Sequence, residues 1–478
     1  MTGRAPHASA AGLDLHLDLP ADLPGTGGVG RALESALREA VRSGRLAAGT
    51  RLPGSRSLAT DLGIARGTVV QVYNRLVTEG WLTAVHGSGT RVARISSQRA
   101  ETETDRHRRF RPEGTGTVDL RPGRPDVSSF PRAAWASSVR EAVSTLEARL
   151  LDYPEPGGAS ELRAVIADYV RRTRGVRAAA DDVVVVPGFA AGLALLARVF
   201  THLGIREVAT ENPGFHRHRE LLRLAGLEVA PLTVDASGAD PAELTSQAGA
   251  VLLTPAHQYP LGVVLAQERR TAFIDWARRN HAFVIEDDYD GEFRYDGRAV
   301  GAMQTLAPDR VVYAGTTSKA LAPGVRLAWL VVPRVLRRPV LAALEETGVQ
   351  APVVDQLALA DLMHGGGYDR HVRDRRLAYR RRRSELTRRL AAIGWAHPAG
   401  AAAGLHTLLP VDTERQERHL VCEAGRTGVR LHGLHTDRYW HQGSRGPAAL
   451  VLGYATPPSH DWPRSLQALA ALLVRHGR

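Results

Sequence analysis

The spacing of apolar residues divides the chain into two patterns. Between residues 26 and 80, apolar positions recur every three or four residues, which predicts short helices. From residue 118 onward, short apolar runs typical of buried strands alternate with helical stretches. Such alternation predicts a mostly parallel sheet with ligand-binding groups at the carboxyl ends of its strands. The clearest strands are expected at 182–186, 208–210, 250–254, 281–286 and 311–314.

The first pattern predicts a helix-turn-helix followed by a β-hairpin. Ser55 is expected to cap a helix that ends at Gly63, and a second helix is expected to begin near Ala65. Strand-like runs at 81–85 and 90–93 flank a glycine-rich turn, which predicts a hairpin wing. The apolar face of the second helix consists of Val69, Val72, Tyr73 and Leu76.

The charge of this segment points to DNA. Nine arginines minus four acidic residues give residues 26–93 a net charge of +5, which favours a polyanionic partner. Recognition helices present their N-terminal residues to base edges in the major groove, so Arg66, Thr68 and Gln71 are candidate base readers. Candidate phosphate contacts are Ser55, Arg56, His86 and Gly87. The alternative is a small helical domain that docks another protein.

The remaining organisation follows from composition. Residues 1–25 are expected to be a loose tail, 94–117 a charged linker, and 118–478 one large α/β domain with a small C-terminal subdomain from about residue 345. One cysteine excludes an internal disulfide, and no apolar run reaches bilayer length. We therefore expect a cytoplasmic protein without a membrane segment, and its net charge of +12 suggests an anionic partner.

Lys319 is the only lysine in 478 residues, since 62 Lys+Arg minus one leaves 61 arginines. Arginine can replace lysine in ion pairs but not as an amine nucleophile, because guanidinium does not lose its proton. Chance survival in an arginine-rich composition explains the scarcity but not the position, which is a loop after an apolar strand. The sequence therefore indicates a Schiff-base lysine.

Acidic residues end the preceding strand at Glu286-Asp-Asp-Tyr-Asp290. A carboxylate there can keep a pyridinium nitrogen protonated, and Tyr289 can bond the ring oxygen. A divalent-metal site is the alternative, because hard cations favour clustered carboxylates. The lysine about 30 residues on, one crossover away, favours the pyridinium interpretation and no metal.

Other strand ends offer groups for an anion and a ring. Gly188 opens a helix whose backbone N–H groups can bind phosphate, and Thr316 and Arg326 can complete that shell. Phe215 is a candidate for stacking on a ring, although core packing is an equal alternative. Candidate arginines for an effector carboxylate are Arg217 and Arg438, with Arg430 as a weaker third.

The N-terminal motifs resemble the GntR family of bacterial regulators. They are Gly49–Arg56, Leu58–Gly63, Ala65–Val69, Leu76–Trp81 and Gly87–Thr90. From residue 118 the chain resembles a fold-type I aminotransferase, and the joined layout resembles the MocR/GabR subfamily of GntR-type transcriptional regulators. The motifs that carry this second resemblance are Leu120–Asp126, Phe130–Trp135, Tyr153–Gly158, Thr254–Gly262, Glu286–Phe293 and Gly315–Arg326.

The resemblance implies pyridoxal 5′-phosphate (PLP) bound to Lys319, with Asp287 at the pyridine nitrogen, Tyr289 at the ring oxygen, Phe215 on the ring face and Arg326 at the phosphate. Gln258, within the Thr254–Gly262 motif, is a further candidate cofactor contact. Phe189 and Ala190 stand where relatives often carry polar side chains, so their backbone would bind the phosphate. A tyrosine placed like Tyr153 reaches the neighbouring subunit's phosphate, which implies a shared-site homodimer.

Three functions remain open at this point. The first is a regulator that binds double-stranded DNA with repeated half-sites and senses an amine or amino acid through an external aldimine, with aldimine exchange or a partial half-reaction as its chemistry. The second is a working aminotransferase with an autoregulatory DNA-binding domain, and the third is a sensor of PLP itself. The arginine-dense run 370–389 is interpreted as a solvated helix face, with a second DNA surface as the alternative; its inward residues are expected to be Leu377, Leu386 and Leu390.

Overall fold

The computed structural model describes residues 26–85, 89–93, 117–153, 155–297, 300–395 and 398–476. Two compact units, Met1–Pro112 and Glu113–Arg478, are each described by themselves. The expected tail, all but residue 117 of the expected linker, and the wing residues His86 and Gly87 lie outside the described residues. Within the described residues, no helix combines the length and apolar character needed to cross a membrane.

The N-terminal unit is a three-helix winged module. Helices α1 (Thr26–Arg42), α2 (Ser55–Asp61) and α3 (Arg66–Thr78) precede the antiparallel strands β1 (Leu82–Val85) and β2 (Gly89–Val92). The face of α3 expected to be apolar is the face that it buries. The cap expectation was wrong: the residue that precedes α2 is Gly54, and Ser55 is already helical, so its hydroxyl caps nothing.

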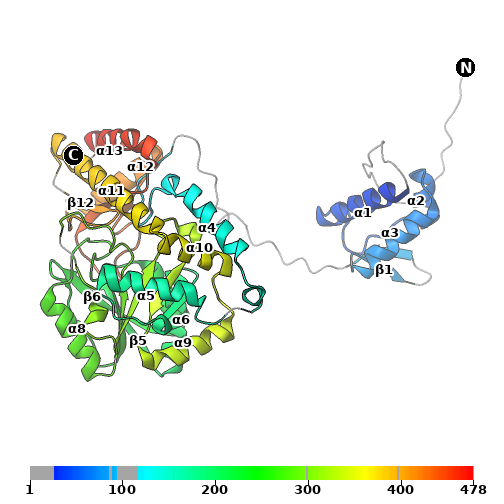
Figure 1. Ribbon diagram of the computed structural model, residues 1–478. Helices are drawn as coiled ribbons and strands as arrows, with labels where there is room; N and C mark the ends of the chain where they lie inside the picture. Colours follow the sequence, from blue (N-terminus) through cyan, green and yellow to red (C-terminus); the bar gives the residue numbers. More distant parts are fainter. Residues whose placement is uncertain are drawn as a thin grey trace, which may run out of the picture. The chain divides into compact units, whose positions relative to one another are not determined.

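The C-terminal unit contains an eight-stranded sheet in the order β4-β11-β10-β9-β8-β5-β6-β7, and Figure 1 shows helices lying around this sheet. Strands β6, β5, β8, β9 and β10 run parallel, whereas β11 is antiparallel to both β10 and β4. The strands are β4 (Val183–Val186), β5 (Glu207–Asn212), β6 (Glu228–Asp235), β7 (Gly238–Ala239), β8 (Ala248–Leu253), β9 (Phe283–Asp287), β10 (Val311–Thr316) and β11 (Ala328–Val331).

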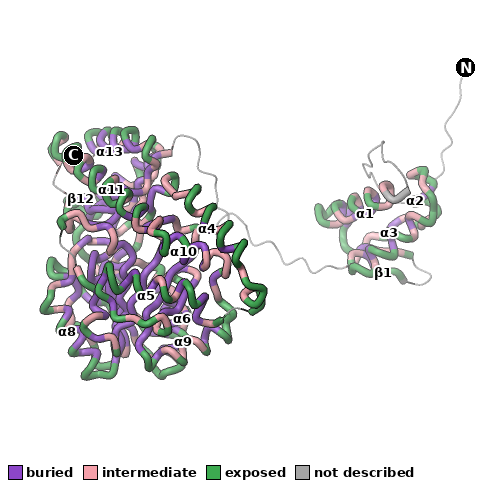
Figure 2. Tube along the Cα trace, viewed as in Figure 1, coloured by how far each residue is buried: buried purple, intermediate pink, exposed green. Residues whose placement is uncertain are grey.

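Helices cover both faces of this sheet because alternate strand residues point in opposite directions. Val183 and Val185 of β4 belong to the core cluster formed with α5 (Ser160–Arg174) and α10 (Val353–His364). Val184 and Val186 belong to the cluster formed with α6 (Phe189–His202) and α9 (Arg334–Thr347). The strands accordingly form the buried centre of the unit (Figure 2).

Two smaller sheets build the part of the unit that carries the C-terminus. Strands β12 (Thr407–Val411), β15 (Ala448–Leu452) and β14 (His432–Gly433) form one, and β3 (Val118–Asp119) pairs in parallel with β13 (Val429–Arg430) in the other. The start of the unit is therefore built into its C-terminal part. The remaining helices are α4 (Arg132–Ser144), α7 (His216–Leu224), α8 (Gln267–Arg279), α11 (Gly367–Ala392), α12 (Glu414–Arg426) and α13 (Trp462–His476).

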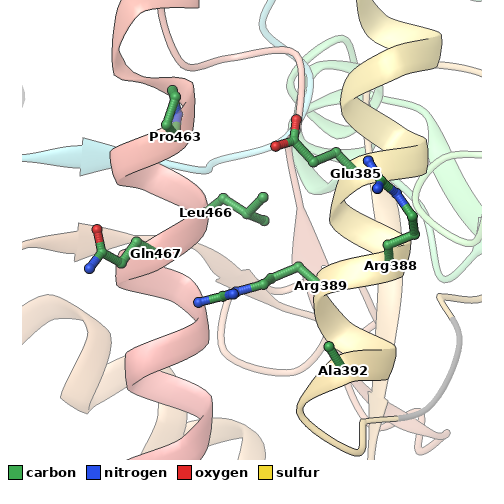
Figure 3. A pocket seen from close by; sticks show the side chains of 7 residues that line it. All are labelled: Glu385, Arg388, Arg389, Ala392, Pro463, Leu466 and Gln467. Atoms are coloured by element: carbon green, nitrogen blue, oxygen red, sulfur yellow. The ribbon is translucent and has the colours of Figure 1, made fainter.

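Helix α11 carries the arginine-dense run. Leu386 and Leu390 are buried as expected, but the expectation for Leu377 was wrong, because 48% of it is exposed. Arg382 is also buried and pairs with Asp126 at 3.0 Å, so the run is not a uniform solvated face. Between α11 and α13 lies a surface groove of 430 Å³ (Figure 3). It is lined by Glu385, Arg388, Arg389, Ala392, Pro463, Leu466 and Gln467.

Candidate functional site

The strand ends predicted to carry the site meet at one edge of the large sheet. Parallel β8, β9 and β10 end there, and β4 ends there too, because it is separated from β10 by the antiparallel β11. Asp287 is the last residue of β9 and pairs in register with Ala314 of β10. Lys319 lies in the turn of residues 317–321 that follows β10.

The Lys319 amine is held by a loop from the start of the unit. Its Nζ donates a hydrogen bond to the carbonyl oxygen of Gly123 at 2.7 Å. Burial lowers the pKa of this amine, the carboxylates of Asp287 and Asp290 oppose that shift, and the positive charge of Arg124 adds to it. A lowered lysine pKa increases the fraction of neutral amine, the form that attacks an aldehyde.

Asp287 is a buried carboxylate without a protein donor. Only 5% of it is exposed, and among the described residues no group donates a hydrogen bond to its oxygens. Burial raises its pKa well above the usual range, and the Lys319 charge counteracts the shift. A buried, unbonded carboxylate is costly, so a cationic group such as a pyridinium nitrogen fits this position.

The acidic residues around Asp287 do not form a metal cluster. Glu286 accepts from the backbone N–H groups of Met303 and Gln304, and Asp288 pairs with Arg174. Glu286 and Asp288 thus have protein partners on different elements, and the absence of a metal among these carboxylates stays a prediction.

One group of three possible ligands is found within the described residues, His257, Asp290 and His406. His257 Nδ1 and Asp290 Oδ2 are already 2.8 Å apart in a hydrogen bond. A shared metal would have to replace that bond, so a hydrogen-bonded pair explains these two side chains without an ion. Burial lowers the pKa of His406 to about 3, which keeps its imidazole neutral.

A cradle for an anion lies at the start of α6. Gly188 precedes the helix with φ +96°, and a Cβ placed on it would lie 3.1 Å from the Arg326 guanidinium. Arg326 is exposed, and no described residue pairs with it. The backbone N–H groups of Phe189 and Ala190 open the helix, where anions bind favourably. Thr316 lies at the same edge and bonds Ser318 at 2.9 Å. These groups fit a phosphate.

Aromatic rings line the side of the site next to α7. His218 stacks edge-on against both Phe189 and Phe215, with ring centroids 5.0 Å apart in each pair. Phe215 also meets Tyr259 at 5.8 Å. Burial lowers the pKa of His218 to about 3, and the Lys319 charge adds to that shift, which places His218 in the field of the lysine. Its participation was not anticipated from the sequence.

Two expected cofactor contacts are occupied by protein groups. Tyr289 is buried, and its hydroxyl donates to the His257 carbonyl at 3.1 Å. The Gln258 amide nitrogen donates to the carbonyls of Pro213 and Tyr259, and its oxygen accepts from Leu261 N–H. Gln258 therefore holds the loop after β8, and a cofactor contact by either residue stays a prediction.

The expected carboxylate-binding arginines are not brought to the lysine. Arg438 forms an ion pair with Glu220 at 3.1 Å, and 71% of its side chain is exposed. Arg217 is exposed at the start of α7. Arg430 lies in β13. Their role in effector binding stays a prediction, and none of them is next to Lys319 in the way that Gly123 and Arg124 are.

The described candidate DNA-contacting residues lie on α2 and α3. Arg56, Arg66 and Gln71 are exposed, and no described side chain pairs with them. Thr68 is half-buried against Gly30, and Ser55 is half-buried at the start of α2. By contrast, Arg38 and Arg75 form ion pairs with Glu34. The positive charge in the first turn of α3 is that of Arg66, which pairs with no described side chain.

Comparison with known proteins defines the class of protein. Residues 30–92 match the gntR family of bacterial regulatory proteins, and residues 119–423 match aminotransferase class I and II. The chain therefore joins a DNA-binding helix-turn-helix of the gntR type to a domain of a PLP-dependent fold family. It belongs to the MocR-like group of gntR-type transcriptional regulators.

The relatives cover nearly the whole chain. The pyridoxine biosynthesis transcriptional regulator PdxR of Corynebacterium glutamicum is 33% identical over 90% of this chain and 92% of its own length. The probable rhizopine catabolism regulatory protein MocR of Rhizobium meliloti is 32% identical over 92% of each chain. An archaeal alanine:glyoxylate aminotransferase shares the fold of the C-terminal unit, with a TM-score of 0.68 and 23% identity over 75% of this chain and 91% of its own.

Glu292, a half-buried acid that accepts a hydrogen bond from Tyr169, gives a pH-dependent stability. Burial raises the pKa of Glu292 to about 7, and Asp288 adds to the shift. An unfolded glutamate ionises near pH 4.5, so folding stability is lost as the pH rises from about 4.5 to about 7 and changes little above that range. Glu292→Gln is expected to be more stable than the wild type by about 1–2 kcal/mol at pH 8 and equal to it at pH 4.

Urea unfolding of both proteins across this pH range measures the difference. Glu345→Gln, on the exposed side of α9, is the matched control and should follow the wild type at every pH. If the free energy of unfolding of Glu292→Gln changes with pH in parallel with that of the wild type, the Glu292 carboxyl ionises without a loss of folding stability, which would contradict the prediction.

Proposed function

We propose that this protein is a transcriptional regulator that holds PLP on Lys319 and changes its DNA binding when an amine or amino acid reaches that lysine. The observation that carries the proposal is the pair formed by the sole lysine and the unbonded, buried Asp287, in a chain that also has a helix-turn-helix. PLP, when bound, supplies an aldehyde for condensation with primary amines and a ring that withdraws electrons.

The residues divide the work of holding the cofactor. Asp287 would hold a proton on the ring nitrogen, and Phe215 with its neighbour His218 would contact the ring. Gly188 and Arg326 would hold the phosphate at the start of α6. Lys319 would supply the amine, which its interaction with the Gly123 carbonyl orients. Arg326 and the helix start would bind the phosphate while Asp287 would bind the ring nitrogen, so these residues would together orient the cofactor.

A shared-site homodimer is part of the proposal. Tyr153 is 98% exposed and Leu151 is 68% exposed in the isolated chain. Large apolar side chains at such exposure favour a partner surface, and the expected role of Tyr153 requires a second subunit. Two winged modules in one dimer would read two half-sites, whose spacing must match the dimer.

The test measures DNA affinity of the PLP-loaded protein by fluorescence anisotropy, on a duplex enriched by the wild-type protein from a random library. The amine panel contains glycine, β-alanine, γ-aminobutyrate, taurine and butylamine. A change in affinity or in preferred half-site spacing with one of them supports the proposal. No enrichment of any sequence would overturn the DNA-binding part, and no bound PLP would overturn the cofactor part.

A second candidate is favoured by one comparison. The relative named as a regulator of pyridoxine biosynthesis is 33% identical to this chain, which favours a sensor in which PLP itself is the signal. DNA affinity that changes on addition of PLP alone, with no amine present, selects this candidate. Affinity that is the same with and without PLP, and changes only with an amine, selects the first.

Arg66→Ala tests the DNA interface. Because Arg66 is exposed and unpaired at the first turn of α3, we expect its loss to cost about 1–3 kcal/mol of specific binding, roughly 10- to 100-fold. Anisotropy titration of the enriched duplex measures the change. Arg334→Ala, an exposed arginine on α9, removes the same charge from the other unit and is expected to bind within about twofold of the wild type. Equal losses in both variants would contradict the assignment.

A further inference from the structure

Of the described arginines on α7 and residues 434–441, Arg219 and Arg438 are engaged by protein groups, whereas Arg217 and Arg223 are exposed. Arg219 is buried and donates to the carbonyls of Gly214, Arg438, Tyr439 and Trp440, so it braces this segment. Arg438 is paired with Glu220. Arg217 directly precedes His218, and neighbouring helical residues project about 100° apart. Arg217 therefore projects to a different side of α7 from His218, the residue that the Lys319 charge affects.

The loop on the other side of the lysine carries Arg124. The Gly123 carbonyl accepts the hydrogen bond from Lys319 Nζ at 2.7 Å, and Arg124 is the next residue. The Thr456 hydroxyl lies 2.6 Å from the Arg121 carbonyl oxygen and 3.2 Å from that of Arg124, so it contacts this loop at two points. The guanidinium is thus tied to a backbone segment that already touches the reactive amine.

The side chain of Arg124 is available for a ligand. Its nearest acid, Asp119, lies 3.6 Å away and is already engaged by Arg121 through both its backbone N–H and its guanidinium. Half of the Arg124 side chain is exposed. A long, solvent-exposed ion pair contributes at most about 1 kcal/mol, so an incoming carboxylate can replace it at small cost.

The charges around Lys319 favour a carboxylate at this end of the site. Asp287 and Asp290 act on the amine as negative groups, and Arg124 acts on it as the positive group. Tyr259 adds a hydroxyl here, because a Cβ on Gly123 would lie 3.6 Å from its oxygen. That hydroxyl is bonded to Tyr439 at 2.9 Å, and Tyr439 is bonded to His432 at 3.0 Å. A ligand carboxylate would be repelled by Asp287 and Asp290. It would be attracted to the Arg124 guanidinium and the Tyr259 hydroxyl.

We propose that Arg124 binds the carboxylate of an amino-acid effector while its amine reaches Lys319. The inference rests on the proposed function and gives it a chemical class, namely an amine that carries a carboxylate. It replaces Arg217 and Arg438, the sequence-based candidates, with a residue of the loop that contacts the lysine.

The experiment uses two probes that do not depend on the natural effector. Aminooxyacetate carries a carboxylate, and methoxyamine does not. Each forms a new C=N bond to the pyridoxal carbon through its amino nitrogen and releases the Lys319 amine, so the loss of the protein's visible absorbance gives both rates. The ratio of the two rate constants, aminooxyacetate over methoxyamine, measures how strongly the protein recognises the carboxylate. A change in the reactivity of the pyridoxal carbon affects both rate constants equally and leaves the ratio unchanged.

The PLP-loaded wild type is expected to give a ratio well above that of free PLP. Arg124→Gln should lower it about 10- to 100-fold, as the loss of a charged hydrogen bond predicts, and Arg124→Lys should restore part of it. Arg217→Gln and Arg438→Gln serve as charge-matched controls and should keep the wild-type ratio. The methoxyamine rate and the thermal midpoint of Arg124→Gln, both expected to match the wild type, exclude a folding defect.

Three results would overturn the assignment. They are a wild-type ratio equal to that of free PLP, an Arg124→Gln ratio equal to the wild type, and a loss confined to a control variant. In each, the protein still reacts with both probes, so the proposed function survives. A protein that takes up no PLP gives no absorbance to follow, and the proposed function and the Arg124 assignment then fail together.

Discussion

Lys319→Ala is expected to abolish covalent attachment of PLP completely. The wild-type protein, incubated with PLP and reduced with borohydride, should gain one cofactor mass on the peptide that contains Lys319. Because the variant has no lysine side chain at all, no other ε-amine can take its place. Intact-mass and peptide spectra measure the result, together with the visible absorbance before reduction.

Lys319→Arg is the matched control for charge, since it keeps a cation at the site but cannot condense with the aldehyde. Both variants should still bind the enriched DNA duplex, because the helix-turn-helix lies in a separate unit. A reduced label on the α-amino group of either variant, equal in yield to the wild-type label, would show that the lysine is not the attachment point.

Arg174→Met is expected to cost about 3–5 kcal/mol of folding free energy. Arg174 and Asp288 are both buried, and the guanidinium bonds both carboxylate oxygens, at 2.6 and 3.0 Å. Tyr313 donates a further hydrogen bond to Asp288 at 2.7 Å. Removal of the arginine leaves a buried carboxylate next to Asp287 without its cation. Urea unfolding at pH 8, followed by near-ultraviolet circular dichroism, measures the loss.

The double variant Arg174→Met/Asp288→Asn is the control for this pair. It removes the charge that the single variant leaves behind, so we expect it to be more stable than Arg174→Met. Arg198→Met, which breaks an exposed pair with Glu346, should cost less than about 1 kcal/mol. A single variant as stable as the wild type would show that water reaches Asp288 and replaces the arginine.

The helices and strands in which apolar residues recur at regular spacing could be predicted from the sequence. Apolar periodicity located α3 and its buried face, and the short apolar runs located β4, β5, β8, β9 and β10 to within a few residues. The family comparisons confirm the helix-turn-helix and the aminotransferase-like domain. Lys319 was found by its rarity, and Asp287 by its position at a strand end. Their roles toward a cofactor stay predictions.

The rest depends on contacts between distant parts of the chain, which leave no local pattern. Gly123 meets Lys319 across 196 positions, and Arg174 meets Asp288 across 114. Ser55 has the chemistry of a helix cap, but the helix begins one residue earlier than a serine cap requires. Leu377 lies nine residues before Leu386, which places it on about the opposite face of a helix, and 48% of it is accordingly exposed.

The pairing of β3 with β13 has a mechanical consequence. The chain that arrives from the DNA-binding unit enters the C-terminal unit at β3, and a few residues later its backbone accepts the hydrogen bond from the Lys319 amine. A ligand that took that amine would remove this hydrogen bond, whereas the backbone bonds of Leu120 and the contacts of Asp126 with Tyr379 and Arg382 would remain. The segment through which the chain enters this unit thus also contacts the reactive amine, so a ligand at Lys319 would act directly on the first residues of the unit.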